Sequence, residues 1–132
     1  AHHLPRRARD VARPPGRAFA EAPGAVFENY LAVQLKTATL SWTEQGHGRY
    51  EVFYLRDQDR REVDFLIARD LKPCALIEAK VSYTEAPTAL KFYCQKLKVP
   101  GFVIYPKGQN RKFEFGYTVN SATFLKSLLT HK

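Results

Sequence analysis

Three strand-like runs joined by short polar links constrain the fold of this chain more than any other feature. The runs cover residues 50–54, 63–67 and 75–80 and are rich in β-branched and aromatic residues. Side chains alternate between the two faces of a strand, so Val63, Phe65 and Ile67 are expected to share one face. The links are too short for a crossover, and the three strands must therefore form an antiparallel meander.

Helices are expected on either side of this meander. The further elements predicted from hydrophobic periodicity are a helix over 26–35, a helix over 85–97, a short buried strand over 102–105, a strand over 113–119 and a last helix capped by Asn120 or Ser121. A strand, a helix and a strand in succession predict a crossover that joins parallel strands. The fold class is therefore α/β, with the order αβββαββα and a mixed central sheet flanked by helices.

The chain reads as one folded domain behind a basic arm. Its 132 residues can bury about two thirds of the unfolded surface, and a hydrophobic content of 45% excludes global disorder. Residues 1–23 hold five arginines and four prolines, so we expect an arm or the tail of a preceding domain there and the folded domain at 24–132. The absence of methionine suggests a piece of a longer polypeptide.

The composition indicates a cytoplasmic protein without a membrane partner. No apolar run reaches the roughly 18 to 20 residues of a membrane span, and nothing at the start resembles a signal peptide. Cys74 and Cys94 are isolated, which favours core thiols in a reducing compartment over a zinc site or a disulfide.

Charged residues interrupt two of the apolar strands. Asp64 lies within 63–67, and Glu78 and Lys80 lie within 75–80. Burying a charge costs several kcal/mol unless the group is paired or bound to a metal. Glu78 and Lys80 share a strand face, and antiparallel pairing would place Asp64 opposite Glu78. Two carboxylates and one ammonium group are therefore expected to converge.

Structural alternatives stay open for each of these residues. Glu78 and Lys80 alone are typical of an exposed ion pair that contributes little. Glu28, at the edge of the apolar stripe of the first helix, is equally typical of an ordinary helix acid. Glu62 is expected on the same strand face as Asp64, and it is either an acid without a role in the site or an auxiliary ligand. Taken together, the acids favour a site, active or relic.

The order and spacing of these motifs resemble the PD-(D/E)XK nuclease superfamily. The runs 26–31, 53–56, 62–67 and 77–80 are similar to one branch, the C-terminal nuclease-like domain of unknown function found behind the ATPase module of bacterial and archaeal AAA+ proteins. The resemblance implies a restriction-endonuclease-like core and an ATPase domain in the same polypeptide. One departure is visible, because Val63 stands where the superfamily has a proline.

The resemblance also implies hydrolysis of DNA phosphodiester bonds with Mg²⁺ or Mn²⁺. Asp64 and Glu78 would be metal ligands, with the backbone carbonyl of Ala79 as a third. Lys80 would position or deprotonate the attacking water and stabilise the transition state. Glu28 matches the helix glutamate that assists the metal.

Residues 86–113 contain no acid and contribute to a net charge of +8. Such a stretch can follow a phosphate backbone, although a lysine-rich helix face is often only solvated. The candidate nucleic-acid contacts are Lys91, Lys96, Lys98, Lys107, Arg111 and Lys112.

Three functions follow from these observations. The first is a metal-dependent nuclease. The second is a non-catalytic module of an AAA+ ATPase that binds nucleic acid or a partner while its carboxylates are idle. The third is a structural scaffold, in which Glu78 and Lys80 pair with each other and no cleft opens above them. The sequence leaves enzymatic activity undecided.

Overall fold

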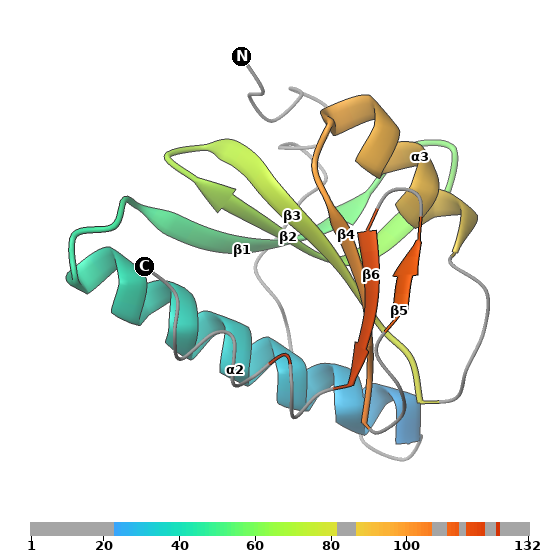
Figure 1. Cartoon of the computed structure of the whole chain (residues 1–132), viewed down its shortest axis with the longest axis horizontal. Coiled ribbons are helices and arrows are strands. Elements are labelled where there is room, and N and C mark those ends of the chain that lie inside the picture. Colours follow the sequence, from blue (N-terminus) through green and yellow to red (C-terminus); the bar gives the residue numbers. More distant parts are fainter. Residues whose placement is uncertain (1–22, 82–86, 107–110, 114–115, 121–123, 125–132) are drawn as a thin grey trace.

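The computed structural model describes residues 23–81, 87–106, 111–113 and 116–120 together with Phe124. Helices and strands follow one another in the order α2, β1, β2, β3, α3, β4, β5 and β6 (Figure 1). Their bounds are α2 Pro23–Glu44, β1 Tyr50–Arg56, β2 Glu62–Arg69, β3 Lys72–Ala79, α3 Thr88–Leu97, β4 Gly101–Tyr105, β5 Arg111–Phe113 and β6 Gly116–Asn120.

The strands form one mixed six-stranded sheet in the order β1-β2-β3-β4-β6-β5. β1, β2 and β3 pair antiparallel, which confirms the predicted meander. β3 and β4 pair parallel with α3 between them in the chain, which confirms the predicted crossover. β6 pairs parallel with β4 and antiparallel with β5.

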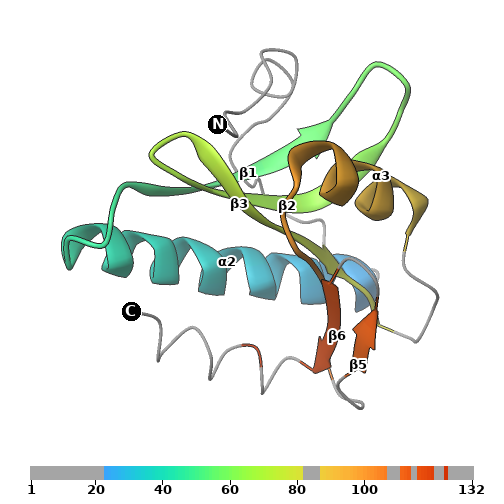
Figure 2. The same cartoon turned by 45° about the horizontal axis from the view of Figure 1, so that its top comes forward.

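Helices α2 and α3 cover opposite faces of this sheet (Figures 1 and 2). The α2-side core contains Leu31, Leu35, Phe65, Ile67, Ile77, Ile104 and Phe124. The α3-side core contains Val63, Leu66, Leu76, Val103, Leu90, Cys94 and Leu97. Each fully buried aliphatic side chain contributes about 2 kcal/mol of transfer free energy. No helix in the described part of the chain combines the length and apolar character needed to cross a membrane.

Both cysteines are free thiols. Cys94 packs in the α3-side core, where burial raises its pKa to about 12. Cys74 is only half-buried, and burial raises its pKa as well. Protonated thiols are poor nucleophiles, so the structure gives neither cysteine the setting of a reactive group.

Two elements differ from the sequence expectation. The first helix extends to Glu44, because the hydroxyls of Thr37, Thr39 and Thr43 bond to carbonyls four residues back and stay satisfied within the helix. The expected strand over 113–119 is an antiparallel pair, β5 and β6. The last predicted helix lies outside the described residues, apart from Phe124.

A β-bulge interrupts β2 beside Asp64. In β1, Phe53 and Leu55 are two residues apart, but their partners in β2, Leu66 and Val63, are three apart. β2 therefore accommodates one extra residue at this point. Bulges bend a strand and redirect its side chains, and they occur often next to functional sites.

The bulge also corrects the predicted alternation. Val63 packs in the α3-side core, whereas Phe65 and Ile67 pack in the α2-side core. The expectation that all three share one face is therefore wrong at Val63. The reason is the extra residue, which shifts the period-two pattern by one position.

Asp57 anchors the turn between β1 and β2 to α3. Its carboxylate accepts hydrogen bonds from the backbone N–H groups of Asp59 (2.8 Å) and Arg61 (3.0 Å). Arg61 Nε (2.8 Å) and the Tyr93 hydroxyl also donate to it. Burial alone raises the pKa of Asp57, but these hydrogen bonds outweigh it and lower the pKa to about 2. The Arg61 guanidinium group also lies 3.8 Å from the ring centre of Phe92.

Tyr93→Phe is expected to lower the free energy of unfolding by about 1–3 kcal/mol, because it removes a donor from a buried carboxylate. Denaturant unfolding at neutral pH measures this loss. The difference from wild type should shrink as pH falls from 3.8 toward 2, where Asp57 takes up its proton in both proteins. Tyr30→Phe, at an exposed position of α2, is the control. Equal losses of unfolding free energy in Tyr93→Phe and Tyr30→Phe would show that the hydrogen bond from Tyr93 to Asp57 does not stabilise the fold.

The turn between β2 and β3 predicts a stabilising substitution. Asp70 and Leu71 have φ angles of 52° and 65° and lie between the paired residues Arg69 and Lys72. Two positive φ angles define a type I′ turn, in which glycine is preferred at the second position. Leu71→Gly should raise the free energy of unfolding by about 0.5–1 kcal/mol, since the left-handed strain exceeds the entropy cost of glycine.

Denaturant midpoints measure this change. Leu40→Gly, at an exposed position in the middle of α2, should instead destabilise by about 1 kcal/mol. A Leu71→Gly protein no more stable than wild type would show that the turn is not strained.

Candidate metal-binding and catalytic site

Asp64 and Glu78 meet at one end of the sheet. Phe65 pairs with Ile77, so the next residues toward this end, Asp64 and Glu78, lie opposite each other. Glu78 Oε1 accepts a hydrogen bond from the backbone N–H of Asp64 at 3.0 Å. Asp64 Oδ2 accepts one from the backbone N–H of Ala79 at 2.8 Å. The two acids thus satisfy backbone donors beyond the last ladder pair.

Lys80 joins these acids at the end of β3. Its Nζ lies 3.8 Å from Glu78 Oε2, and 39% of its side chain is exposed against 7% for Glu78. The backbone N–H of Lys80 donates to the carbonyl of Ile104 at 2.9 Å, which fixes the residue beside β4. The ammonium group therefore offsets part of the Glu78 charge and still reaches solvent.

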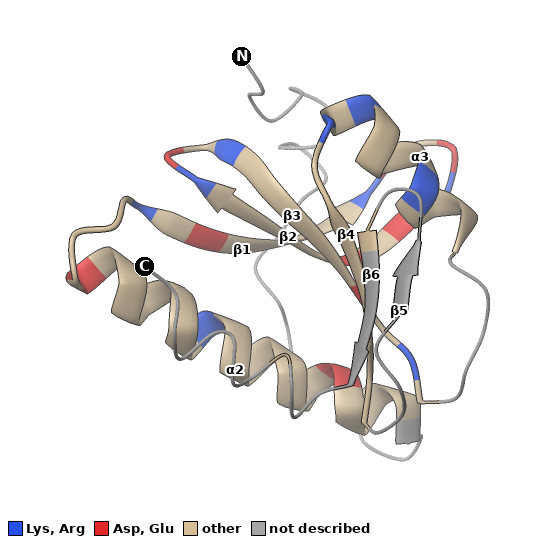
Figure 3. Cartoon of the chain, in the orientation of Figure 1, with Lys and Arg blue, Asp and Glu red and all other residues tan. Residues whose placement is uncertain are grey.

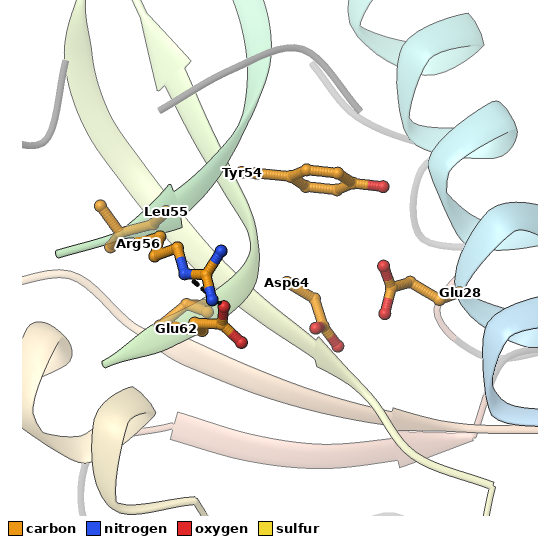
Figure 4. Close-up of a pocket in the computed structure, with 7 residues that line it drawn as sticks. Glu28, Tyr54, Leu55, Arg56, Glu62 and Asp64 are labelled. Atoms are coloured by element: carbon orange, nitrogen blue, oxygen red, sulfur yellow. Dashed lines mark ion pairs between the residues drawn. The ribbon is translucent and has the colours of Figure 1, made fainter. Parts of the chain in front are cut away.

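Helix α2 contributes Glu28 from the opposite side of the site. The carboxyl group of Glu28 is hydrogen-bonded to the carboxyl group of Asp64 and to the hydroxyl of Tyr54. Figure 4 shows these three side chains pointing toward one another. A hydrogen bond between two carboxyl groups requires a proton on one of them. A proton on either carboxyl group would therefore be shared by Glu28 and Asp64, in line with the raised pKa of Glu28.

Burial raises the pKa values of all three acids, and repulsion by Asp64 adds to this effect at Glu28 and Glu78. Burial first, and then the charge of Asp64, raise the pKa of Glu28 to about 7 and that of Glu78 to about 8. Burial also raises the pKa of Asp64, against the opposing hydrogen bond from the N–H of Ala79. The charge of Lys80 lowers the pKa values of Asp64 and Glu78 only in part, and a divalent cation would supply the further positive charge that keeps such carboxyl groups ionised.

A pocket of about 170 Å³ adjoins the acids. Glu28 and Asp64 line one part of it, and Arg56 and Glu62 line another (Figure 4). Arg56 Nε lies 2.7 Å from Glu62 Oε1, and more than half of each side chain is exposed. Glu62 is therefore paired with arginine, and its charge also contributes to the raised pKa of Glu28.

This donor set fits a Mg²⁺ or Mn²⁺ ion that keeps part of its water shell. Among the residues that the structure describes, no three Asp, Glu, His or Cys side chains are arranged to hold a metal ion. Mg²⁺ is commonly bound through one or two carboxylates and several waters, and Asp64 with Glu78 provides that number. Ala79 contacts Asp64 through its N–H, and the role predicted for its carbonyl stays a prediction.

Comparison with known proteins places the chain in a family. The model of the family described as Domain of unknown function (DUF4143) matches residues 23–125. The chain belongs to this family. The match confirms the expected membership of a family of domains of unknown function, and the relation to nucleases stays a prediction. No curated protein and no solved structure matches the chain.

The described lysines of this DUF4143 domain that were predicted to contact nucleic acid lie on α3 or at its end, apart from Glu28 on α2. Lys91 and Lys96 are exposed on α3 and Lys98 caps its end, on the sheet face opposite α2 (Figure 3). Lys96 Nζ lies 5.7 Å from the ring centre of Phe92. Lys107 lies outside the described residues. Arg111 and Lys112 belong to β5, and their side chains are outside the description.

Sequence reasoning missed Tyr54 and Arg56 as parts of this site. Tyr54 reads from the sequence as an ordinary alternating strand residue, and only the packing of α2 brings Glu28 to its hydroxyl. A signal for Arg56 does exist, because Arg56 and Glu62 carry opposite charges on either side of a polar hairpin link. Equal spacing from a hairpin turn predicts that two residues lie opposite each other.

Glu78→Gln is expected to stabilise the metal-free domain above pH 8. The pKa of Glu78 rises from 4.5 to about 8 in the folded domain, so its contribution to stability is complete below pH 4.5 and is lost as pH rises through 8. Glutamine keeps the shape of the side chain and does not titrate. The stability of Glu78→Gln relative to wild type should therefore increase as pH rises.

Thermal unfolding at pH values below 4.5 and above 8, with a chelator present, measures the effect. Glu44→Gln, at the exposed end of α2, is the control. A constant difference between wild type and Glu78→Gln across this range would show that Glu78 holds no extra proton.

Proposed function

We propose that this domain is a metal-dependent nuclease-like domain that hydrolyses DNA phosphodiester bonds. The observation that carries the proposal is the meeting of Asp64, Glu78 and Lys80 at one sheet end, with Glu28 facing them from α2. The order of a helix, a three-stranded meander, a crossover helix and a parallel strand supports a restriction-endonuclease-like core.

Each group has a chemical role in this proposal. A bound divalent ion would neutralise charge on the phosphoryl oxygens and make water nucleophilic. Asp64 and Glu78 would hold the ion, with the carbonyl of Ala79 completing the protein ligands. Lys80 has a partly exposed amine that can position or deprotonate the attacking water and stabilise developing negative charge. Glu28 would give up its shared proton and assist the metal.

The proposed partners are DNA and an ATPase domain in the same polypeptide. The exposed amines of Lys91 and Lys96 support DNA binding, since neutralising phosphates releases counterions. Lys98, Lys107, Arg111 and Lys112 extend the same basic stretch along the sequence. Membership of the DUF4143 family supports the link to AAA+ ATPases through the resemblance noted in the sequence.

A non-catalytic nucleic-acid- or partner-binding module of an AAA+ ATPase is the second candidate. The observation that favours it is the internal pairing of the acids, because Asp64 and Glu78 accept backbone N–H groups and Glu78 pairs with Lys80. Carboxylates kept for strand pairing alone would show the same contacts. The pocket beside Asp64 and Glu28 is what a purely structural scaffold does not require.

Substitutions at the site residues should affect metal binding and DNA cleavage differently. Asp64→Asn and Glu78→Gln should weaken Mn²⁺ binding, because each removes a hard anionic ligand. Lys80→Ala should keep metal binding and reduce cleavage of a mixed DNA substrate by about 10²–10⁴-fold, because its role lies in proton transfer. Calorimetric Mn²⁺ titration and a gel assay of DNA cleavage measure the two properties.

Lys72→Ala, at the opposite end of β3, is the control and should match wild type in both assays. Equal cleavage by wild type and all site variants would indicate another source of activity. DNA binding without cleavage by wild type in Mg²⁺ or Mn²⁺ would support the binding module instead.

A further inference from the structure

Arg56 is the basic side chain of a pocket that is otherwise rich in acids. The acids among the described residues that line this pocket are Glu28, Glu62 and Asp64. These carboxylates repel a negatively charged substrate in the pocket. A cation in the lining can offset this repulsion as well as pair across the strands.

The geometry leaves most of the Arg56 guanidinium group available. Arg56 and Glu62 are direct partners in the β1–β2 register, and their ion pair joins Nε to one carboxylate oxygen at 2.7 Å. A guanidinium group carries five N–H donors in a planar fork that matches phosphate oxygens. With 59% of its side chain exposed, Arg56 presents part of this fork to solvent at the pocket.

The neighbouring turn fixes the backbone next to Arg56. Asp57, the next residue, is anchored by Tyr93 of α3 and by Arg61. Glu62 pairs with Nε of the guanidinium group from the facing strand. This pair orients the fork before an anion binds, which favours a specific contact over a diffuse one.

We propose that Arg56 forms a phosphate-binding subsite that holds a phosphodiester group of a DNA strand beside the carboxylates Asp64 and Glu28. This inference rests on the proposed function and adds a substrate contact to it. Glu62 is a positioning residue that orients Arg56 and competes with the phosphate for it. The metal ion and Arg56 together offset the acids that the strand would otherwise meet.

Two substitutions, compared with the same charge changes elsewhere on the domain, separate this subsite from a cross-strand ion pair. A purely structural pair predicts that Arg56→Gln and Glu62→Gln change DNA affinity no more than those distant substitutions do. The subsite predicts opposite effects on DNA affinity. Arg56→Gln should weaken binding about tenfold or more, because a charged hydrogen-bond donor is lost. Glu62→Gln should strengthen binding by about threefold, because a competing charge is removed.

Fluorescence anisotropy of a short single-stranded DNA oligonucleotide, with Ca²⁺ as the metal, measures these affinities. A salt series should show a log–log slope smaller by about one for Arg56→Gln. Arg56→Lys should keep the slope and recover only part of the affinity, since it keeps the charge without the fork. Thermal unfolding of each variant checks that the fold is intact.

The matched control is the ion pair between Arg49 and Glu51 at the other end of β1. Arg49 Nε lies 3.8 Å from Glu51 Oε1, roughly 20 Å along the strand from Arg56. Arg49→Gln and Glu51→Gln make the same charge changes away from the pocket. Both should bind DNA as wild type does, and effects equal to those at Arg56 and Glu62 would overturn the subsite.

A second probe keeps this test independent of catalysis. Titration of the ¹⁵N-labelled domain with diethyl phosphate in Ca²⁺ should shift the Nε–H signal of Arg56, and Arg49 should stay unchanged. A shift together with lost DNA affinity in Arg56→Gln supports the subsite even if wild type cleaves no DNA, in which case only the nuclease proposal fails. An unmoved Arg56 signal, or wild-type affinity in Arg56→Gln, overturns the subsite even if wild type cleaves DNA.

Discussion

An exchange of hydrogen bonds between β2 and β3 closes the end of the sheet on which the candidate site depends. The backbone N–H of Asp64 donates to Glu78 Oε1, and the carboxylate of Asp64 accepts a hydrogen bond from the N–H of Ala79. Buried N–H groups need acceptors, so these acids complete the sheet at the point where its ladder ends. The same acids form the candidate site. The hydrogen bonds that pair the two strands therefore also fix the positions of the two carboxylates.

The bulge beside Asp64 explains why this arrangement reaches α2. A regular strand would place Asp64 on the same face as Leu66, which packs toward α3. The extra residue in β2 interrupts that alternation, and the Asp64 carboxyl group meets Glu28 instead, which also contacts Tyr54 of β1. A local irregularity of one residue thus gathers groups from a helix and two strands.

Much of this fold could be predicted because it depends on local patterns. Alternating apolar residues with short links leave few choices except a meander, and an apolar strand after a helix predicts a parallel partner. The convergence of Asp64, Glu78 and Lys80 followed from the same period-two geometry. Residues whose placement depends on distant packing could not be predicted this way. A bulge leaves no mark in the pattern of apolar residues, so the sequence misplaced Val63. The anchor of Asp57 needs Tyr93 from a helix that comes much later in the chain.

The position of Glu28 depends on how α2 is attached to the sheet. Near its end the helix is tied to the start of β1, where the backbone N–H of Tyr50 donates to Thr43 Oγ1 at 2.9 Å. Glu28 lies 15 residues earlier in the same helix, which is roughly 22 Å along its axis. With a pivot at Thr43, a tilt of about 5° displaces Glu28 by about 2 Å over that length. A displacement of that size would break its hydrogen bond to Asp64, so the buried contacts of Leu31 and Leu35 that hold α2 against the sheet also keep the third carboxyl group in the cluster.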